Sequence, residues 1–149
     1  MSHALATIER PTGPVGDAKP PPAVPDGHHW EDAGDAWGRR ARDWACLFEH
    51  YSIDAVTAVL ERLEVAAGDH LLDVACGSGL AIRMAHARGL GTAGIDASAS
   101  LIAIARERVP TSDLRVGTMF ELPWADESFQ AVTAVNGVWG GCEAALAEA

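Results

Sequence analysis

Basic residues are scarce in this sequence. Lysine and arginine together number 11, against 21 aspartates and glutamates, which gives a formal net charge of −10. Nucleic acids and anionic membrane surfaces are bound through basic patches that offset the repulsion of phosphate groups. The acidic balance therefore argues against nucleic acid or membrane as the main partner and favours a small molecule or a protein.

Cysteines and long apolar runs are also few. The three cysteines are odd in number, lie far apart and form no CxxC pair, so neither a disulfide framework nor a zinc knuckle is predicted. The N-terminus lacks the basic-then-apolar order of a signal peptide, and no apolar run approaches the roughly 18 residues of a membrane helix. We expect a soluble, cytoplasmic protein.

The 149 residues are enough for one domain with a real core if most of the chain folds. Residues 1–29 are rich in proline and glycine, which predicts a disordered tail. At its end, His28 and His29 could pair on a metal, but no further ligands follow at suitable spacing, so we expect solvated histidines and no metal site. Residues 30–66 are predicted to form a helical segment, and residues 67–149 a ligand-binding domain.

An aromatic stripe marks the helical segment, which we expect to be helical from about residue 35. Trp30, Trp37, Trp44 and Tyr51 recur every seven residues, close to two helical turns, so those within one helix share a face. The favoured interpretation is that the stripe packs the helix onto the domain. The alternative is that one or two rings also wall a ligand pocket.

Beyond this segment, short apolar runs alternate with helical patterns. Strand and helix alternate four times with short links, which predicts a parallel sheet with helices on both faces, a Rossmann-like wound fold. Ser52 and Ser98 are expected to serve as N-caps of two of the helices. The predicted strands are 71–74, 91–96, 113–116 and 129–135, and the predicted helices are 53–63, 80–88, 98–109 and 142–149.

A glycine turn follows the first of these strands. Gly77 and Gly79 let the backbone approach a ligand closely, and the helix that starts behind them favours an anionic group at its free N–H groups. Asp96, 19 residues after Gly77, ends the second strand, where a carboxylate can accept hydrogen bonds from ribose hydroxyls. Both NAD sites and S-adenosylmethionine sites share this feature.

The missing motifs narrow the choice of ligand. A dinucleotide fingerprint GxGxxG that starts at Gly77 would need its third glycine at position 82, which is Ile82. The sequence also has no GxxxxGK[ST] loop, so nucleoside triphosphates are not expected. Because the third glycine is missing, a nicotinamide oxidoreductase is the least favoured function.

Four motifs in order resemble one family. Residues 71–79 (LLDVACGSG) resemble motif I of class I S-adenosylmethionine-dependent methyltransferases, and residues 94–98 (GIDAS) resemble the acidic motif of strand two. The resemblance continues through 114–118 (LRVGT) and the turn 122–129 (LPWADESF) before strand four, and it covers residues 35–149. It implies that the cofactor is S-adenosylmethionine and that residues 67–149 are part of its Rossmann-like binding domain.

The resemblance also implies a set of cofactor-binding residues. The backbone of the glycine turn would hold the methionine part of the cofactor, with Asp73 near its amino group and Asp96 on the ribose. A hydroxyl stands at position 118, where the family often has an acid for the adenine amino group, so we expect weaker binding there. The full set is Asp73, Ala75, Cys76, Gly77, Ser78, Gly79, Asp96, Ala97, Thr118, Met119, Phe120, Asn136 and Gly137.

The family's sheet has seven strands, and only the first four are expected here. The resemblance therefore implies a C-terminally shortened member with an exposed, uncharged strand-four edge over residues 131–135, where self-association is expected. Two functions stay open: methyl transfer to a small molecule, or a non-catalytic remnant that binds the cofactor or acts as an interaction module. Calorimetry with S-adenosylmethionine, S-adenosylhomocysteine and NAD, together with turnover on a panel of small acceptors, would separate them.

No catalytic residue is singled out. The protein's main task in this chemistry is to align acceptor and methyl group, and a base is needed only when the acceptor loses a proton. Cys76 is expected to pack inside the turn rather than act as a nucleophile, because no neighbour in sequence would activate it. The candidate bases in the N-terminal part are His28, His29, Glu31, Asp35 and Tyr51.

Overall fold

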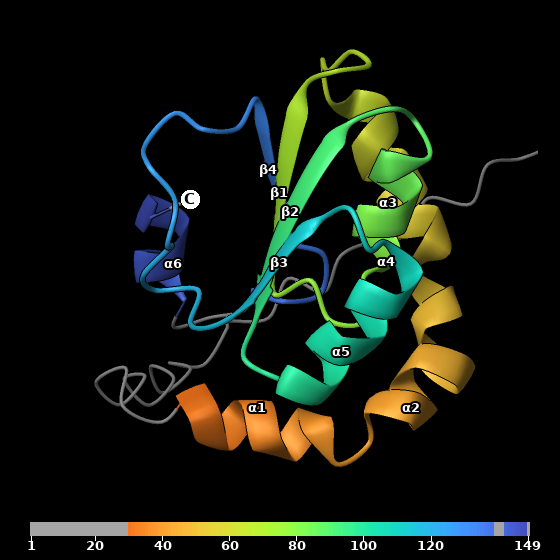
Figure 1. The fold of residues 1–149 in the computed structure, drawn as a ribbon, viewed down its shortest axis with the longest axis vertical. Helices are drawn as coiled ribbons and strands as arrows, with labels where there is room; N and C mark the ends of the chain where they lie inside the picture. The colour runs from red at the N-terminus through yellow and green to blue at the C-terminus, as the bar shows by residue number, and fades with distance from the viewer. Residues whose placement is uncertain (1–29, 139–141, 149) are drawn as a thin grey trace, which may run out of the picture.

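The structure, a computed structural model, describes residues 30–138 and 142–148. Its centre is a sheet of four parallel strands in the order β3-β2-β1-β4 (Figure 1). The chain thus starts in the middle of the sheet, moves outward through β2 and β3, and returns to the other side of β1, as a doubly wound sheet does. The strands are β1 (His70–Val74), β2 (Gly91–Asp96), β3 (Asp113–Val116) and β4 (Ala131–Thr133).

The register of the sheet brings the carboxyl ends of three strands together. Asp73 on β1 lies opposite Gly94 on β2 and Thr133 on β4. β2 runs two residues further and ends at Asp96. Ligands of parallel sheets bind beyond the carboxyl ends of the strands, so this register defines where a site can form.

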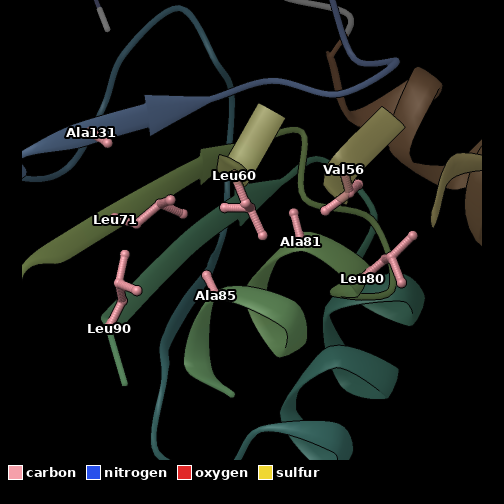
Figure 2. Packing of buried hydrophobic residues seen from close by; sticks show 8 residues of the cluster. All are labelled: Val56, Leu60, Leu71, Leu80, Ala81, Ala85, Leu90 and Ala131. Carbon is pink, nitrogen blue, oxygen red and sulfur yellow. The ribbon is translucent and has the colours of Figure 1, made fainter. Parts of the chain in front are cut away.

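Three helices cover one face of the sheet (Figure 1): α3 (Ile53–Arg62), α4 (Leu80–His86) and α5 (Ala99–Arg108). Leu71 and Ala131 of the sheet meet the inner side chains of α3 and α4 (Figure 2). The apolar side chains gathered there are removed from water, which stabilises the contact. The cluster consists of Val56, Leu60, Leu71, Leu80, Ala81, Ala85, Leu90 and Ala131.

The opposite face is covered mainly by a loop. Leu72, Val74, Ala93 and Ile95 form its buried cluster. The side chains packed on them come from β4 and the segment between β3 and β4, while the short helix α6 (Glu143–Glu148) lies on the same side (Figure 1). The packed side chains are Met119, Leu122, Trp124, Phe129 and Val132.

The N-terminal segment is helical but not one helix. α1 (Trp30–Gly38) is followed by a break and by α2 (Ala41–Asp43), a π-helical turn (Trp44–Phe48) and a 3₁₀ turn (Glu49–Ser52). The aromatic stripe is split by these changes of pitch. Trp37 and Tyr51 are 49% and 77% exposed, so the interpretation that the whole stripe packs onto the domain is wrong.

Most predicted elements are confirmed, and two details differ. Ser98 caps α5, because its Oγ accepts a hydrogen bond from the Leu101 N–H at 3.3 Å. Ser52 is not a side-chain cap, since the chain enters α3 from a helical turn and its hydroxyl is used elsewhere. Strand four forms only over β4, three residues instead of the seven predicted.

The last two expectations concern the N-terminal tail and membrane helices. The predicted tail and His28 and His29 lie outside the described residues. Within residues 30–138 and 142–148, no helix is long and apolar enough to cross a membrane.

Candidate functional site

A cavity of about 160 Å³ opens at the carboxyl ends of β1, β2 and β4. Its lining comes from three parts of the chain that lie far apart in sequence: the N-terminal segment, the glycine turn with the start of α4, and the residues that follow β2 and β4. The lining residues are Ala33, Trp37, Trp44, Glu49, Ser52, Val56, Asp73, Ala75, Cys76, Gly77, Leu80, Ala81, Asp96, Ala97, Leu101, Val135, Asn136 and Gly137.

The glycine turn is held against β2 by its own backbone. The Cys76 N–H donates to the Ile95 carbonyl at 3.0 Å, and the Gly77 N–H donates to Oδ2 of Asp96 at 2.8 Å. Ala75 and Gly77 both have φ of +55°, a left-handed conformation that is unusual for alanine. Such strain is found where the surrounding structure fixes a loop for function, and here it curls the turn around the cavity.

Asp96 is both a support for the turn and a wall of the cavity. Its Oδ1 accepts from the Ser98 N–H at 2.8 Å, while Oδ2 takes the bond from Gly77. Burial raises the pKa of this carboxyl group above its usual value, and the two backbone donors act in the opposite direction. Each carboxylate oxygen accepts two hydrogen bonds, so both keep room for a ligand hydroxyl.

Asp73 is the most deeply buried acid of the cavity. It is 3% exposed and accepts a hydrogen bond from the Thr133 hydroxyl at 2.7 Å. Burial raises the pKa of Asp73 from 3.8 to about 7, against the lowering effect of the Thr133 bond. A cationic group in the cavity would favour its ionised form, because an opposite charge at close range stabilises a buried carboxylate.

The loop after β4 closes the cavity on one side. A Cβ added to Gly137 would lie 2.4 Å from Cβ of Ala75, so only glycine fits so close to the turn. Its neighbour Asn136 has φ of +61° and donates from Nδ2 to the Ser52 hydroxyl at 2.8 Å. That hydrogen bond joins the loop to the N-terminal segment across the mouth of the cavity.

The N-terminal segment is attached to the turn by a buried polar cluster. Glu49 is 6% exposed; its Oε1 accepts from the Ser78 hydroxyl at 2.5 Å and its Oε2 pairs with Nη1 of Arg108 at 2.6 Å. Arg108 also donates to the carbonyls of Ser78 at 2.8 Å and Ala45 at 3.2 Å. The cluster therefore ties three segments together beside the cavity.

The predicted cofactor-binding residues divide into two groups. Those that line the cavity are Asp73, Ala75, Cys76, Gly77, Asp96, Ala97, Asn136 and Gly137. Those of the described chain that lie outside its lining are Ser78, Gly79, Thr118, Met119 and Phe120.

The second group has other contacts. Ser78 belongs to the polar cluster with Glu49, and Met119 packs on the far face of the sheet. The Thr118 hydroxyl accepts from the Phe120 N–H at 3.2 Å, in the turn that follows β3. Their roles toward a cofactor stay predictions.

The structure adds residues that the sequence analysis did not select. Trp37 and Trp44 line the cavity with their rings 5.5 Å apart, edge to face, as the alternative interpretation of the stripe had it. The repeat of seven was the signal for them, whereas no pattern marked Glu49. Of the candidate bases in the described chain, Glu31, Asp35 and Tyr51 do not line the cavity.

Cys76 is buried with Ile82 and Ile102, and burial raises the pKa of its thiol well above the usual value, so it packs as a protonated residue, as predicted. Among the described residues, no three His, Cys, Asp or Glu side chains gather as metal ligands would.

Comparison with known proteins gives related sequences and structures. A demethylmenaquinone methyltransferase of Chlorobaculum parvum is 34% identical over 90 residues, which cover 60% of this chain and 37% of that protein. A 27-O-demethylrifamycin SV methyltransferase of Amycolatopsis mediterranei is 36% identical over 94 residues, covering 56% of this chain and 35% of that protein. This chain thus spans about a third of the length of these relatives.

A solved methyltransferase structure is also similar to this chain. Geranyl diphosphate methyltransferase, in complex with GPP and sinefungin, superposes with a TM-score of 0.51 and 27% identity over 54% of this chain and 33% of that one. The sequence profile of the methyltransferase domain matches residues 71–149, from β1 to the last residue of the chain. With its wound parallel sheet and glycine turn, the chain belongs to the methyltransferase domain family.

Proposed function

We propose that the protein binds S-adenosylmethionine in the cavity and transfers its methyl group to a small molecule. The observation that carries the proposal is the pair of carboxylates, buried Asp73 and partly buried Asp96, that line one cavity beside the glycine turn. S-adenosylmethionine has an amino-acid tail that carries an ammonium group, and a ribose with two hydroxyls. The two acids match these two ends.

The remaining donors and acceptors fit the same ligand. Asp73 would take the ammonium group, whose charge compensates the burial of the carboxylate. Asp96 would accept from the ribose hydroxyls with the lone pairs that Gly77 and Ser98 leave free. Support also comes from the related structure that was solved with sinefungin, an analogue of S-adenosylmethionine.

The predicted residues after β3 extend this arrangement. The Gly117 N–H donates to the Asp96 carbonyl at 3.0 Å, so the segment 118–120 starts beside the end of β2. We propose that Thr118, Met119 and Phe120 flank the adenine, with Ala97 on its other side.

When bound, the cofactor would supply a methyl group on a sulfonium: the acceptor's nucleophile would bond to the methyl carbon while the sulfur leaves as a neutral thioether. The residues of this chain hold, orient and desolvate the reacting groups. Trp37, Trp44 and Val56 provide apolar walls on the side of the N-terminal segment, where they exclude water from the reacting centre. An acceptor with an apolar body fits walls of this kind.

Isothermal titration calorimetry with S-adenosylmethionine, S-adenosylhomocysteine and NAD tests the proposal. We expect the first two to bind and NAD not to bind. Asp96→Asn should weaken both about tenfold or more, because the amide has one acceptor oxygen instead of two, while Asp126→Asn, in an exposed loop, should leave them unchanged. Binding of NAD alone would refute the proposal.

A second assay separates transfer from binding. The chain is incubated with S-adenosylmethionine and a panel of small acceptors, and S-adenosylhomocysteine is measured. Release that depends on the acceptor supports methyl transfer. Tight binding without any release would assign the chain the role of a cofactor-binding module.

A further inference from the structure

We propose that Trp44 is a ligand-binding residue whose indole N–H donates a hydrogen bond to the carboxylate of the cofactor's amino-acid tail, and that Glu49 positions it. This inference rests on the proposed function and extends it to a residue that lies outside the glycine motif. Trp44 belongs to the N-terminal segment, 33 positions before Gly77 in the sequence.

The position of the indole is the first argument. Trp44 lines the cavity, and its Nε1 lies 3.8 Å from the point where a Cβ on Gly77 would stand. The indole nitrogen therefore faces the bare backbone of the glycine turn. A side chain at position 77 would narrow the gap between them, so the glycine leaves space for a ligand group under the indole.

The second argument is that the donor is unused. Tryptophan Nε1 is a donor only, and that of Trp44 is open to the cavity, because the side chain is only partly buried and no buried side-chain donor of the described residues lacks a partner. Within residues 30–138 and 142–148, no hydrogen bond is made by Nε1 of Trp44, whereas Nε1 of Trp124 donates to Asp113 at 2.9 Å. A ligand that covers the indole takes this N–H out of water, so an acceptor on the ligand is favoured there.

The chemistry of the ligand then selects the acceptor. An α-amino acid carries its carboxylate on the same carbon as its ammonium group. If the ammonium faces Asp73, the carboxylate must lie nearby, because the two groups share one carbon. Trp44 offers a donor at the turn, and a hydrogen bond to a charged acceptor is about twice as strong as a neutral one.

Glu49 fixes this position through both its backbone and its side chain. Its N–H donates to the Trp44 carbonyl and closes the π-helical turn. Such a bond places residues five apart on one side of the turn, whereas in an α-helix of 3.6 residues per turn they would lie about 140° apart. Trp44 and Glu49 can therefore both line the cavity.

The side chain of Glu49 anchors that turn to the cofactor loop. Its carboxylate holds the hydroxyl of Ser78 and the guanidinium of Arg108, and Arg108 in turn holds the carbonyl of Ala45 inside the π-helical turn. A partly buried ion pair thus links the turn that carries the indole to the glycine turn. Glu49 positions Trp44, because its carboxylate holds the turn that carries the indole.

The test compares two ligands that differ in the tail. S-adenosylhomocysteine has the carboxylate, while 5′-methylthioadenosine has the same nucleoside and sulfur without an amino acid. Trp44→Phe keeps an aromatic ring and removes the N–H. We expect it to weaken S-adenosylhomocysteine about tenfold or more in calorimetry and to change 5′-methylthioadenosine less than twofold.

The control is Trp124→Phe, which removes an indole N–H on the other face of the sheet and should change neither affinity. If Trp44→Phe weakens both ligands equally, the ring only packs. If it weakens neither ligand, the indole makes no contact with them. Both results overturn the inference while leaving the proposed function intact. If the unmodified protein binds neither ligand, the proposed function falls, and this inference with it.

Glu49→Gln tests the positioning role. The amide keeps the acceptor for Ser78 and loses the charge that Arg108 pairs with. We expect a loss of about threefold or more for S-adenosylhomocysteine and none for 5′-methylthioadenosine, with a circular-dichroism melt to check the fold. A lower melting temperature with unchanged affinity for both ligands would make Glu49 structural only and would overturn its assignment.

Discussion

The buried carboxyl of Asp73 should make the stability of the protein fall as the pH rises towards neutrality. Its pKa is about 7 in the folded chain and 3.8 in the reference state. Below about pH 3.8 both states hold the proton, and the buried acid has no electrostatic cost. Between pH 3.8 and 7 the unfolded chain ionises while the folded chain does not, so this group lowers the free energy of unfolding.

The size of the effect follows from the same two values. At about 1.4 kcal/mol per pKa unit, the difference corresponds to roughly 4 kcal/mol above pH 7. Asp73→Asn has nearly the same shape, and its amide oxygen can still accept from the Thr133 hydroxyl. The variant should therefore be more stable than the parent by a few kcal/mol at pH 8, and equal to it near pH 4.

Urea unfolding at several pH values between 4 and 8 measures this difference directly. Asp126→Asn, which removes an exposed carboxylate, serves as the control and should stay within about 0.5 kcal/mol of the parent throughout. Parallel stability curves for the parent and Asp73→Asn over this range would refute the reasoning. Asp73→Asn should also weaken cofactor binding, because it removes the carboxylate that would bind the ammonium group even though it stabilises the fold.

Three further outcomes are expected. Binding of S-adenosylmethionine at pH 7 should release about half a proton, because the ligand's ammonium favours ionised Asp73; calorimetry in buffers of different ionisation enthalpy measures the release, and Asp73→Asn should abolish it. Gly137→Ala should destabilise the fold by about 1–3 kcal/mol in urea, since the new methyl group meets Ala75 at 2.4 Å; an unchanged midpoint would contradict the close contact. The proposed self-association through β4 should be weakened by Ala134→Lys, which puts a charge beside this edge; light scattering that finds the parent monomeric at high concentration speaks against it.

The elements of the sheet could be predicted because local signals agree with tertiary packing. The run before Gly77 is apolar and short, and it forms strand β1 as predicted. Ser98 precedes helix α5 with no helical residue in front of it, and it caps that helix as predicted. Ser52 has the same residue type as Ser98, but its helix continues from a 3₁₀ turn. No backbone N–H is therefore left for its side chain to cap.

The cavity could be predicted on one side only. Asp73, Gly77 and Asp96 lie at fixed offsets from strand ends, which sequence spacing reports. Glu49 depends on a π-helical turn and on Arg108, 59 positions away, and neither leaves a periodic pattern in the sequence. A buried ion pair between distant segments becomes visible only when the chain is folded.

The hydrogen bond between Asn136 and Ser52 has a consequence for the order in which the protein matures on the ribosome. The two residues are 84 positions apart, so at about 5–20 residues per second Ser52 is made roughly 4–17 s before its partner. The glycine turn is made early in this interval, whereas the loop after β4 is made only at its end. The ligand pocket is therefore completed late, and a nascent chain should gain the ability to bind ligand only once residue 136 has left the exit tunnel.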